Sequence, residues 1–145
     1  MSKLLLDTNV VSELMRDEPS SNVLNWFMQI NNQTLFSCAV TKAEILSGIA
    51  LLPEGKRKQA LVKDAELTFS EDFASECLPF DTDAAAYYAY VISSRKNIGR
   101  PIAMADAQIA AIALSQNLAL VTRNVKDFEQ IQGLMLINPW LPQNV

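Results

Sequence analysis

The sequence predicts a single α/β domain in which helices flank a mainly parallel central sheet, and three observations support this prediction. Short apolar segments, such as residues 3–6 and 118–122, alternate with segments of helical periodicity. A chain of 145 residues can bury a sizeable core and fits one domain over residues 1–145. Half of the residues are hydrophobic, which is typical of a packed protein and argues against disorder.

The first predicted strand ends at an acidic residue. Residues 3–6 read as a short buried strand, and Asp7 follows it directly. Residues 8–18 then carry apolar side chains at helical spacing, and Thr8 or Asn9 is the expected N-cap of this helix. The sequence therefore places a carboxylate where the chain leaves the core.

The next helix, strand and helix contain a second notable acid, Glu44. Residues 19–30 predict a helix that opens at its proline and serine, and residues 34–40 predict the second strand. Residues 41–52 predict a helix in which Thr41 is the expected N-cap. Glu44 follows three residues later, which is a capping-box pattern.

The alternation continues in the second half of the chain. Residues 54–76 are amphipathic and predict a helix, and residues 77–80 predict a short strand. Residues 81–97 predict another helix, opened by Asp81 or Asp83.

The last predicted elements place a polar residue beside the first strand's acid. Residues 104–117 predict an alanine-rich helix, and residues 118–122 and 134–138 predict the final strands. Ligands of parallel α/β sheets bind beyond the carboxyl ends of the strands. Asp7 lies at such an end, and so does Asn124, just past the strand at 118–122.

The composition excludes several classes of site. The chain has no histidine, which excludes Ser-His-Asp and Cys-His catalysis and His-ligated zinc. No GK[ST] follows a glycine loop and no GxGxxG is present, so a P-loop or a dinucleotide fingerprint is not expected. With 12 basic and 16 acidic residues, the net charge of −4 does not favour nucleic-acid binding through bulk charge. Such binding would need a local basic patch or metal ions.

The sequence also predicts a cytoplasmic protein without membrane contact. Cys38 and Cys77 lie far apart and form no CxxC motif, so both are expected to be reduced and buried. The N-terminus lacks the zones of a signal peptide. No apolar run approaches the roughly 20 residues that a membrane span requires.

Three acids are the candidate functional residues, although each also has an ordinary structural interpretation. Asp7 could cap the first helix, but its neighbours could do so equally well. Glu44 could complete a capping box or contact the helix dipole. One turn after it, Gly48 interrupts a helix, which suggests the close approach of another backbone or of a substrate. Asp106 could complement the dipole of its own helix.

Asp106 gives the strongest indication of a metal site. Its helical neighbours Ile109, Ala110 and Ala113 form an apolar face, and no lysine or arginine lies one turn away. An unpaired buried carboxylate requires a cation. Because histidine and a thiol pair are lacking, oxygen ligands of this kind suit Mg²⁺ or Mn²⁺. One or two such ions can activate a water and stabilise the leaving oxygen in phosphodiester cleavage.

Four motifs, LLLDTNVVSEL, TKAEILSGI, ADAQIAAIAL and LVTRNVKDF, resemble those of the PIN-domain family. More narrowly, the chain is similar to the VapC-type toxins of bacterial toxin–antitoxin pairs, in the subgroup that includes the FitB-like proteins. The motifs occur in order along nearly the whole chain. The resemblance implies a PIN-like, Rossmann-like parallel sheet, an acidic pocket for Mg²⁺ or Mn²⁺ and endoribonuclease activity. It also implies homodimers and neutralisation by a small cognate antitoxin.

The family's acids fall on residues already singled out. The resemblance assigns the first acid to Asp7, the glutamate to Glu44 and the third acid to Asp106, as catalytic residues and metal ligands. Thr8 and Asn9 match the DTN motif and are expected to support the site. In the expected reaction, a metal-activated water cleaves a structured RNA, either transfer RNA or ribosomal RNA.

The fourth acidic position departs from the family pattern. Many members carry aspartate where this chain has Asn124, which can offer a carbonyl ligand or position a water but carries no charge. Thr122 matches the hydroxyl residue that precedes this position. Arg123 could touch phosphate or be a solvated charge. Asp127 is expected to be a capping or surface residue.

Two alternatives to a ribonuclease remain open at this stage. The domain could be a non-catalytic RNA- or protein-binding module in which Asn124 marks a degraded metal site. The same acids could also serve a metal-dependent phosphatase or a DNA nuclease, because carboxylates do not read the 2′-hydroxyl of RNA.

Overall fold

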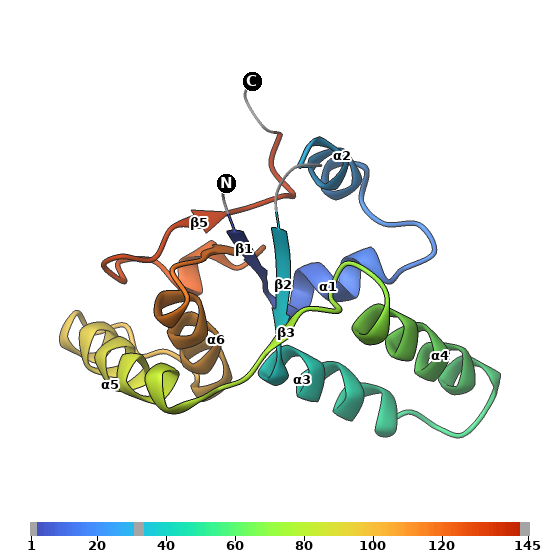
Figure 1. Ribbon diagram of the computed structural model, residues 1–145, viewed down its shortest axis with the longest axis horizontal. Coiled ribbons are helices and arrows are strands. Elements are labelled where there is room, and N and C mark those ends of the chain that lie inside the picture. Colours follow the sequence, from blue (N-terminus) through green and yellow to red (C-terminus); the bar gives the residue numbers. More distant parts are fainter. Residues whose placement is uncertain (1–2, 31–33, 143–145) are drawn as a thin grey trace.

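The computed structural model describes residues 3–30 and 34–142, which form the predicted α/β fold (Figure 1). Five strands form one sheet in the order β3-β2-β1-β4-β5, and every neighbouring pair is parallel. The strands are β1 (Lys3–Leu6), β2 (Thr34–Cys38), β3 (Cys77–Leu78), β4 (Ala119–Val121) and β5 (Leu136–Ile137). The sequence prediction of a mainly parallel sheet is therefore confirmed.

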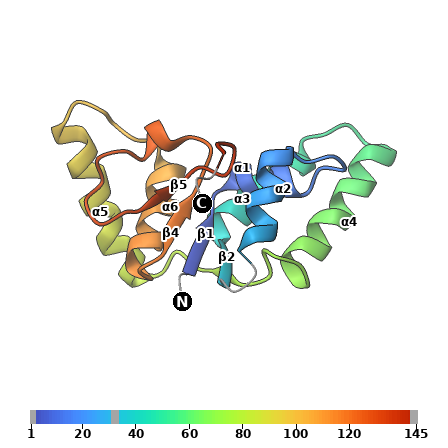
Figure 2. The same ribbon diagram turned by 90° about the horizontal axis from the view of Figure 1, so that it is seen from above.

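Helices lie on both sides of this sheet, which is the arrangement that parallel strands require. The helices are α1 (Thr8–Leu14), α2 (Ser21–Gln29), α3 (Ala39–Ala50), α4 (Lys56–Ser70), α5 (Thr82–Asn97) and α6 (Met104–Ser115). In both views, α5 and α6 lie on one side of the sheet and α1 to α4 on the other (Figures 1 and 2). A 3₁₀ helix, η1 (Val125–Asp127), follows β4.

The central strand β1 shows why its sequence is continuously apolar. Leu5 packs into a core with Ile109 and Leu120, on the side of α5 and α6. Leu4 and Leu6 point the opposite way, into a second core that contains residues of α1, α2 and α3. Both faces of β1 are thus covered, so each of its three leucines is buried.

Several element boundaries differ from the predicted ones. The first helix ends at Leu14 rather than at residue 18, and its N-cap is Asp7 rather than Thr8 or Asn9. The second strand ends at Cys38, and α3 begins at Ala39 with Cys38 as its N-cap, so the prediction of Thr41 as N-cap is wrong.

Other predicted boundaries were closer. Asp81, one of the two predicted caps of α5, accepts a hydrogen bond from the backbone N–H of Ala84 at 3.0 Å.

Both cysteines are free, with Cys38 buried and Cys77 partly buried. Within residues 3–30 and 34–142, no helix combines the length and apolar character needed to cross a membrane.

The topology brings four segments to one edge of the sheet. Strand β1 ends at Leu6, and the backbone N–H of Asp7 donates to the carbonyl of Val121 at the end of β4, at 2.9 Å. The N-terminus of α6 and the first half of α3 contribute the remaining acidic residues. The carboxyl edge of the sheet is therefore the place to examine for a site.

Candidate active site

Asp7 is the most rigidly held acid at this edge. Its side chain is buried, and its Oδ1 accepts a hydrogen bond from the backbone N–H of Thr8 at 2.8 Å. Its Oδ2 accepts from the hydroxyl of Thr122 at 2.7 Å and from the side-chain amide of Asn9 at 3.2 Å. Asp7 is thus an N-cap, as its structural interpretation predicted. The hydrogen bonds to its other oxygen also fix the orientation of the carboxylate.

The segment after β4 is bound to this carboxylate through Thr122. The buried hydroxyl of Thr122 donates to Asp7 and accepts from the backbone N–H of Asn124 at 3.0 Å. The backbone N–H of Arg123 donates to the side-chain oxygen of Asn9 at 3.2 Å. The predicted supporting residues therefore form one hydrogen-bonded group around Asp7.

Glu44 reaches the same place from α3. Its Oε1 accepts a hydrogen bond of 2.6 Å from the hydroxyl of Thr8, and that hydroxyl also lies 3.1 Å from the Thr41 hydroxyl. Because α3 begins at Ala39, Glu44 lies beyond its first turn, so the capping-box interpretation is wrong. The glutamate instead contacts α1, next to Asp7.

Asp106 lies in the first turn of α6, with the apolar face that its sequence predicted. Ile109, Ala110 and Ala113 are all fully buried, whereas Asp106 itself is partly buried. Burial, followed by the nearby charges of Asp7, Asp127 and Glu44 in that order, raises the pKa of its carboxyl from 3.8 to about 6.

Asp7 shares this electrostatic environment. Burial raises the pKa of Asp7 above its ordinary value, and the charge of Glu44 acts in the same direction. The hydrogen bonds from Thr122, Thr8 and Asn9 favour the charged form and oppose this shift. The net direction is upward, so burial and the charge of Glu44 together outweigh the three hydrogen bonds.

Asp127 is the functional candidate that the sequence did not reveal. It is exposed, as expected of a surface residue, but its charge is one of those that raise the pKa of Asp106. The short helix η1 brings it back toward the site, since its backbone N–H donates to the carbonyl of Asn124 at 2.9 Å. The three-residue spacing between Asn124 and Asp127 was the available signal, because one 3₁₀ turn joins residues at that spacing.

Asn124 and Arg123 are exposed to solvent, and their backbone N–H groups donate to Thr122 and Asn9, two neighbours of Asp7. Asn124 is the N-cap of η1, and its side chain forms no cap hydrogen bond. The guanidinium of Arg123 lies 5.0 Å from the centre of the Trp140 ring, a cation–π contact that holds this side chain at the sheet edge.

The four carboxylates of Asp7, Glu44, Asp106 and Asp127, called the acidic cluster below, are oxygen donors of the kind that Mg²⁺ and Mn²⁺ prefer. Within residues 3–30 and 34–142, none of them forms a salt bridge with lysine or arginine. The same ranges contain no group of three or more acidic, cysteine or histidine side chains that could hold a metal ion. Mg²⁺ suits such an open arrangement, because it usually keeps several waters and takes only one or two carboxylates from the protein.

Comparison with known proteins agrees with this geometry. The PIN domain family model matches residues 4–134. The chain is 40% identical to the "VapC ribonuclease Y4jK" of Sinorhizobium fredii, over 96% of this chain and 99% of that protein. It is 27% identical to the "tRNA(fMet)-specific endonuclease VapC" of Shigella flexneri, over 92% and 96% of the two chains.

A solved structure supports the same assignment. The crystal structure of FitAcB from Neisseria gonorrhoeae superposes with a TM-score of 0.83 at 38% identity, covering 94% of this chain and 98% of that chain. Fold, motifs and full-length similarity agree with the resemblance drawn from the sequence. The chain therefore belongs to the PIN domain family, and within it to the group of VapC and FitB.

Proposed function

We propose that this protein is a divalent-metal-dependent endoribonuclease that acts as the toxin of a toxin–antitoxin pair. The observation that carries the proposal is the acidic cluster, whose negative charge no basic side chain of the described ranges neutralises. Support also comes from full-length relatives that are named as ribonucleases.

Asp7 and Asp106 are the residues that would hold Mg²⁺ or Mn²⁺, with Glu44 beside them. When bound, such an ion lowers the pKa of a water and stabilises negative charge on the phosphate and leaving oxygen. Asp7 is preorganised for this task because three hydrogen bonds fix its carboxylate. Glu44 is exposed and uses Oε1 toward Thr8, so its Oε2 can orient the attacking water.

Asn124 and Asp127 divide the task of the fourth acidic position. The side chain of Asn124 offers a neutral oxygen at the sheet edge, whereas Asp127 brings a charge close enough to affect Asp106. The charge of Asp127 argues against the alternative that Asn124 marks a degraded site. The proposal therefore keeps Asn124 as a supporting catalytic residue and adds Asp127 to it.

The substrate in this proposal is a structured RNA, either transfer RNA or ribosomal RNA. Arg123 is exposed beside the acidic cluster and can contact a phosphate adjacent to the one that is cleaved. A relative named for its specificity toward a transfer RNA favours transfer RNA as the first substrate to test. Because RNA of both kinds is cytoplasmic, the proposal places the protein in the cytoplasm.

The partners in this proposal are an antitoxin and a second copy of the chain. The structural neighbours are toxin–antitoxin complexes, which supports an antitoxin partner. A groove of about 300 Å³ runs from Glu44 along α1 and α3, lined by apolar side chains, by the exposed Gly48 and by the polar side chains of Thr8, Ser12 and Arg16. An apolar segment of the antitoxin can lie in this groove and cover the cluster. The homodimer is testable by light scattering on the purified protein.

The test is cleavage of a labelled transfer-RNA pool with Mn²⁺, with Mg²⁺ and with EDTA. Wild type is compared with Asp7→Asn and Asp106→Asn, and with Asp64→Asn as a control at an exposed acid of α4, outside the cluster. We expect discrete fragments that vanish with EDTA and in the two cluster variants but persist in the control. Cleavage that survives in both cluster variants, or transfer and ribosomal RNA that stay intact with folded wild type, would contradict the proposal.

A further inference from the structure

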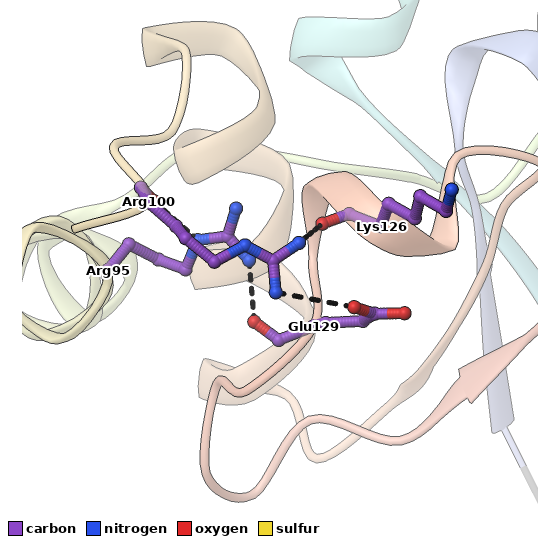
Figure 3. Close-up of polar contacts among 4 residues, drawn as sticks. All are labelled: Arg95, Arg100, Lys126 and Glu129. Atoms are coloured by element: carbon purple, nitrogen blue, oxygen red, sulfur yellow. Dashed lines mark hydrogen bonds and ion pairs between the residues drawn. The ribbon is translucent and has the colours of Figure 1, made fainter. Parts of the chain in front are cut away.

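Arg95 is a buried arginine that binds no carboxylate in the described part of the chain (Figure 3). It lies near the end of α5. Its Nε donates to the backbone carbonyl of Arg100 at 2.8 Å, and its Nη1 donates to the backbone carbonyl of Glu129 at 2.5 Å. One guanidinium therefore bridges two loops that are remote from each other in sequence.

The first of these loops leads to the acidic cluster. Helix α5 ends in a Schellman motif, in which the N–H of Gly99 donates to the carbonyl of Lys96 and that of Arg100 to the carbonyl of Arg95. Gly99 has a φ of +72°, a conformation that this motif reserves for glycine. A few residues later the chain enters α6, whose first turn carries Asp106.

The second loop contains Asp127, the acid whose place near the site the sequence did not predict. Glu129 lies two positions beyond Asp127, and its carboxylate also pairs with the guanidinium of Arg100 at 3.3 Å. That guanidinium donates a second hydrogen bond to the carbonyl of Lys126 at 2.8 Å, as Figure 3 shows. Arg95 and Arg100 thus donate hydrogen bonds to backbone carbonyls on both sides of Asp127.

A buried guanidinium restricts the backbone more than an exposed one does. Its charge has left water and is stabilised only by the carbonyls that it faces, so moving either carbonyl away is strongly unfavourable. The planar fork also fixes the angle between the two carbonyls. Phe128 is fully buried and anchors the same segment in the core, but an aromatic anchor does not fix the orientation of the neighbouring peptide groups.

We propose that Arg95 is a positioning residue that holds the segment of Asp127 against the N-terminus of α6, and so sets the separation of Asp127 and Asp106. This inference rests on the proposed function only where it concerns the metal. It assigns a role in the site to a residue whose side chain faces away from solvent, toward the backbone that carries the acids.

The first experiment needs no metal and measures amide hydrogen exchange at a temperature where all variants are folded. Arg95→Lys retains the charge but not the planar fork, Arg95→Gln removes both, and Lys96→Gln is the control at the exposed neighbouring position. We expect faster exchange of the Asp127 and Phe128 amides in both Arg95 variants, with unchanged exchange in the centre of α6. Unchanged exchange at these two amides, or a uniform increase throughout the protein, would overturn the inference.

The second experiment measures Mn²⁺ affinity by calorimetry. We expect Arg95→Lys to weaken binding about tenfold, which is typical of residues that orient metal ligands, and Lys96→Gln to leave it unchanged. Added to Asp127→Asn, the Arg95→Lys change should weaken binding less than about twofold further, because its effect passes through Asp127. A full, additive effect would overturn this route. Wild type that binds no Mn²⁺ would contradict the proposed function, while the exchange experiment still decides the role of Arg95.

Discussion

Replacing Asp106 with asparagine should stabilise the metal-free protein at neutral pH, although it removes one of the proposed catalytic acids. The pKa of Asp106 is raised from 3.8 to about 6 in the folded protein. Folding therefore opposes its ionisation, and the difference between the two pKa values corresponds to at most about 3 kcal/mol. Asp106 is only partly buried, and solvent screens its interactions with the neighbouring charges. We therefore expect Asp106→Asn to raise the free energy of unfolding by about 1–3 kcal/mol.

The sign of the pH dependence follows from the raised pKa. Between pH 3.8 and about 6 the folded state binds more protons at Asp106 than the unfolded state does, so wild-type stability falls as the pH rises through this window. Above the window the loss is complete, and below it the loss is absent. The advantage of Asp106→Asn should therefore be full at pH 7.5 and vanish near pH 3.5.

Urea unfolding followed by circular dichroism tests both statements in EDTA. Repeating the measurement with Mn²⁺ should reverse the order, because a ligand present at about a thousand times its dissociation constant stabilises wild type by about 4.1 kcal/mol. The variant should gain little. A variant that is less stable than wild type in EDTA at pH 7.5, or that gains as much from Mn²⁺, would refute the reasoning. Asp64→Asn serves as the control and should change stability by no more than about 0.5 kcal/mol.

Three further substitutions test other contacts. Thr122→Val removes the hydroxyl between Asp7 and the Asn124 backbone, and should lower the free energy of unfolding by about 1–3 kcal/mol in urea titrations. Gly48→Ala should raise it by about 0.5–1 kcal/mol, because nothing lies within 4 Å of the added Cβ, and RNA cleavage assays should show unchanged activity. Arg123→Ala should weaken RNA binding and reduce the slope of log affinity against log salt concentration by about 1, as expected for the loss of one phosphate contact. The Mn²⁺ affinity measured by calorimetry should stay unchanged.

The fold was predictable because its main signal is strong and local. The three leucines of β1 are buried on both faces, so their run of apolar residues predicted a central parallel strand. Helix starts were less predictable because several residues compete for each cap. Thr41 matched a capping-box pattern, but its hydroxyl lies against Thr8 and Cys38, and α3 begins two residues earlier.

The site was predictable where the chemistry depends on single residues, and unpredictable where it depends on contacts between distant ones. An acid directly after a buried strand made Asp7 a candidate site residue, and the structure places it at the carboxyl edge of the sheet. The sequence favoured Thr8 or Asn9 as the cap, yet the structure shows that Asp7 caps α1. One oxygen caps and the other accepts from Thr122, so the two roles coexist. The bond from Thr8 to Glu44 and the reach of Asp127 toward Asp106 depend on the tertiary fold.

The carboxylates of the acidic cluster repel one another, and this explains why the neighbours of Asp7 are polar and donate hydrogen bonds to it. Burial and like charges raise the pKa of Asp7 and Asp106, so the metal-free site is destabilising at neutral pH. The divalent cation of the proposed function would reverse that situation, because it would attract carboxylates that repel one another. The hydrogen bonds from Thr122, Thr8 and Asn9 then keep Asp7 in place while the ion is absent. In the proposed function, the fold thus gives up stability in the free protein so that little reorganisation would be needed to bind the metal and the RNA.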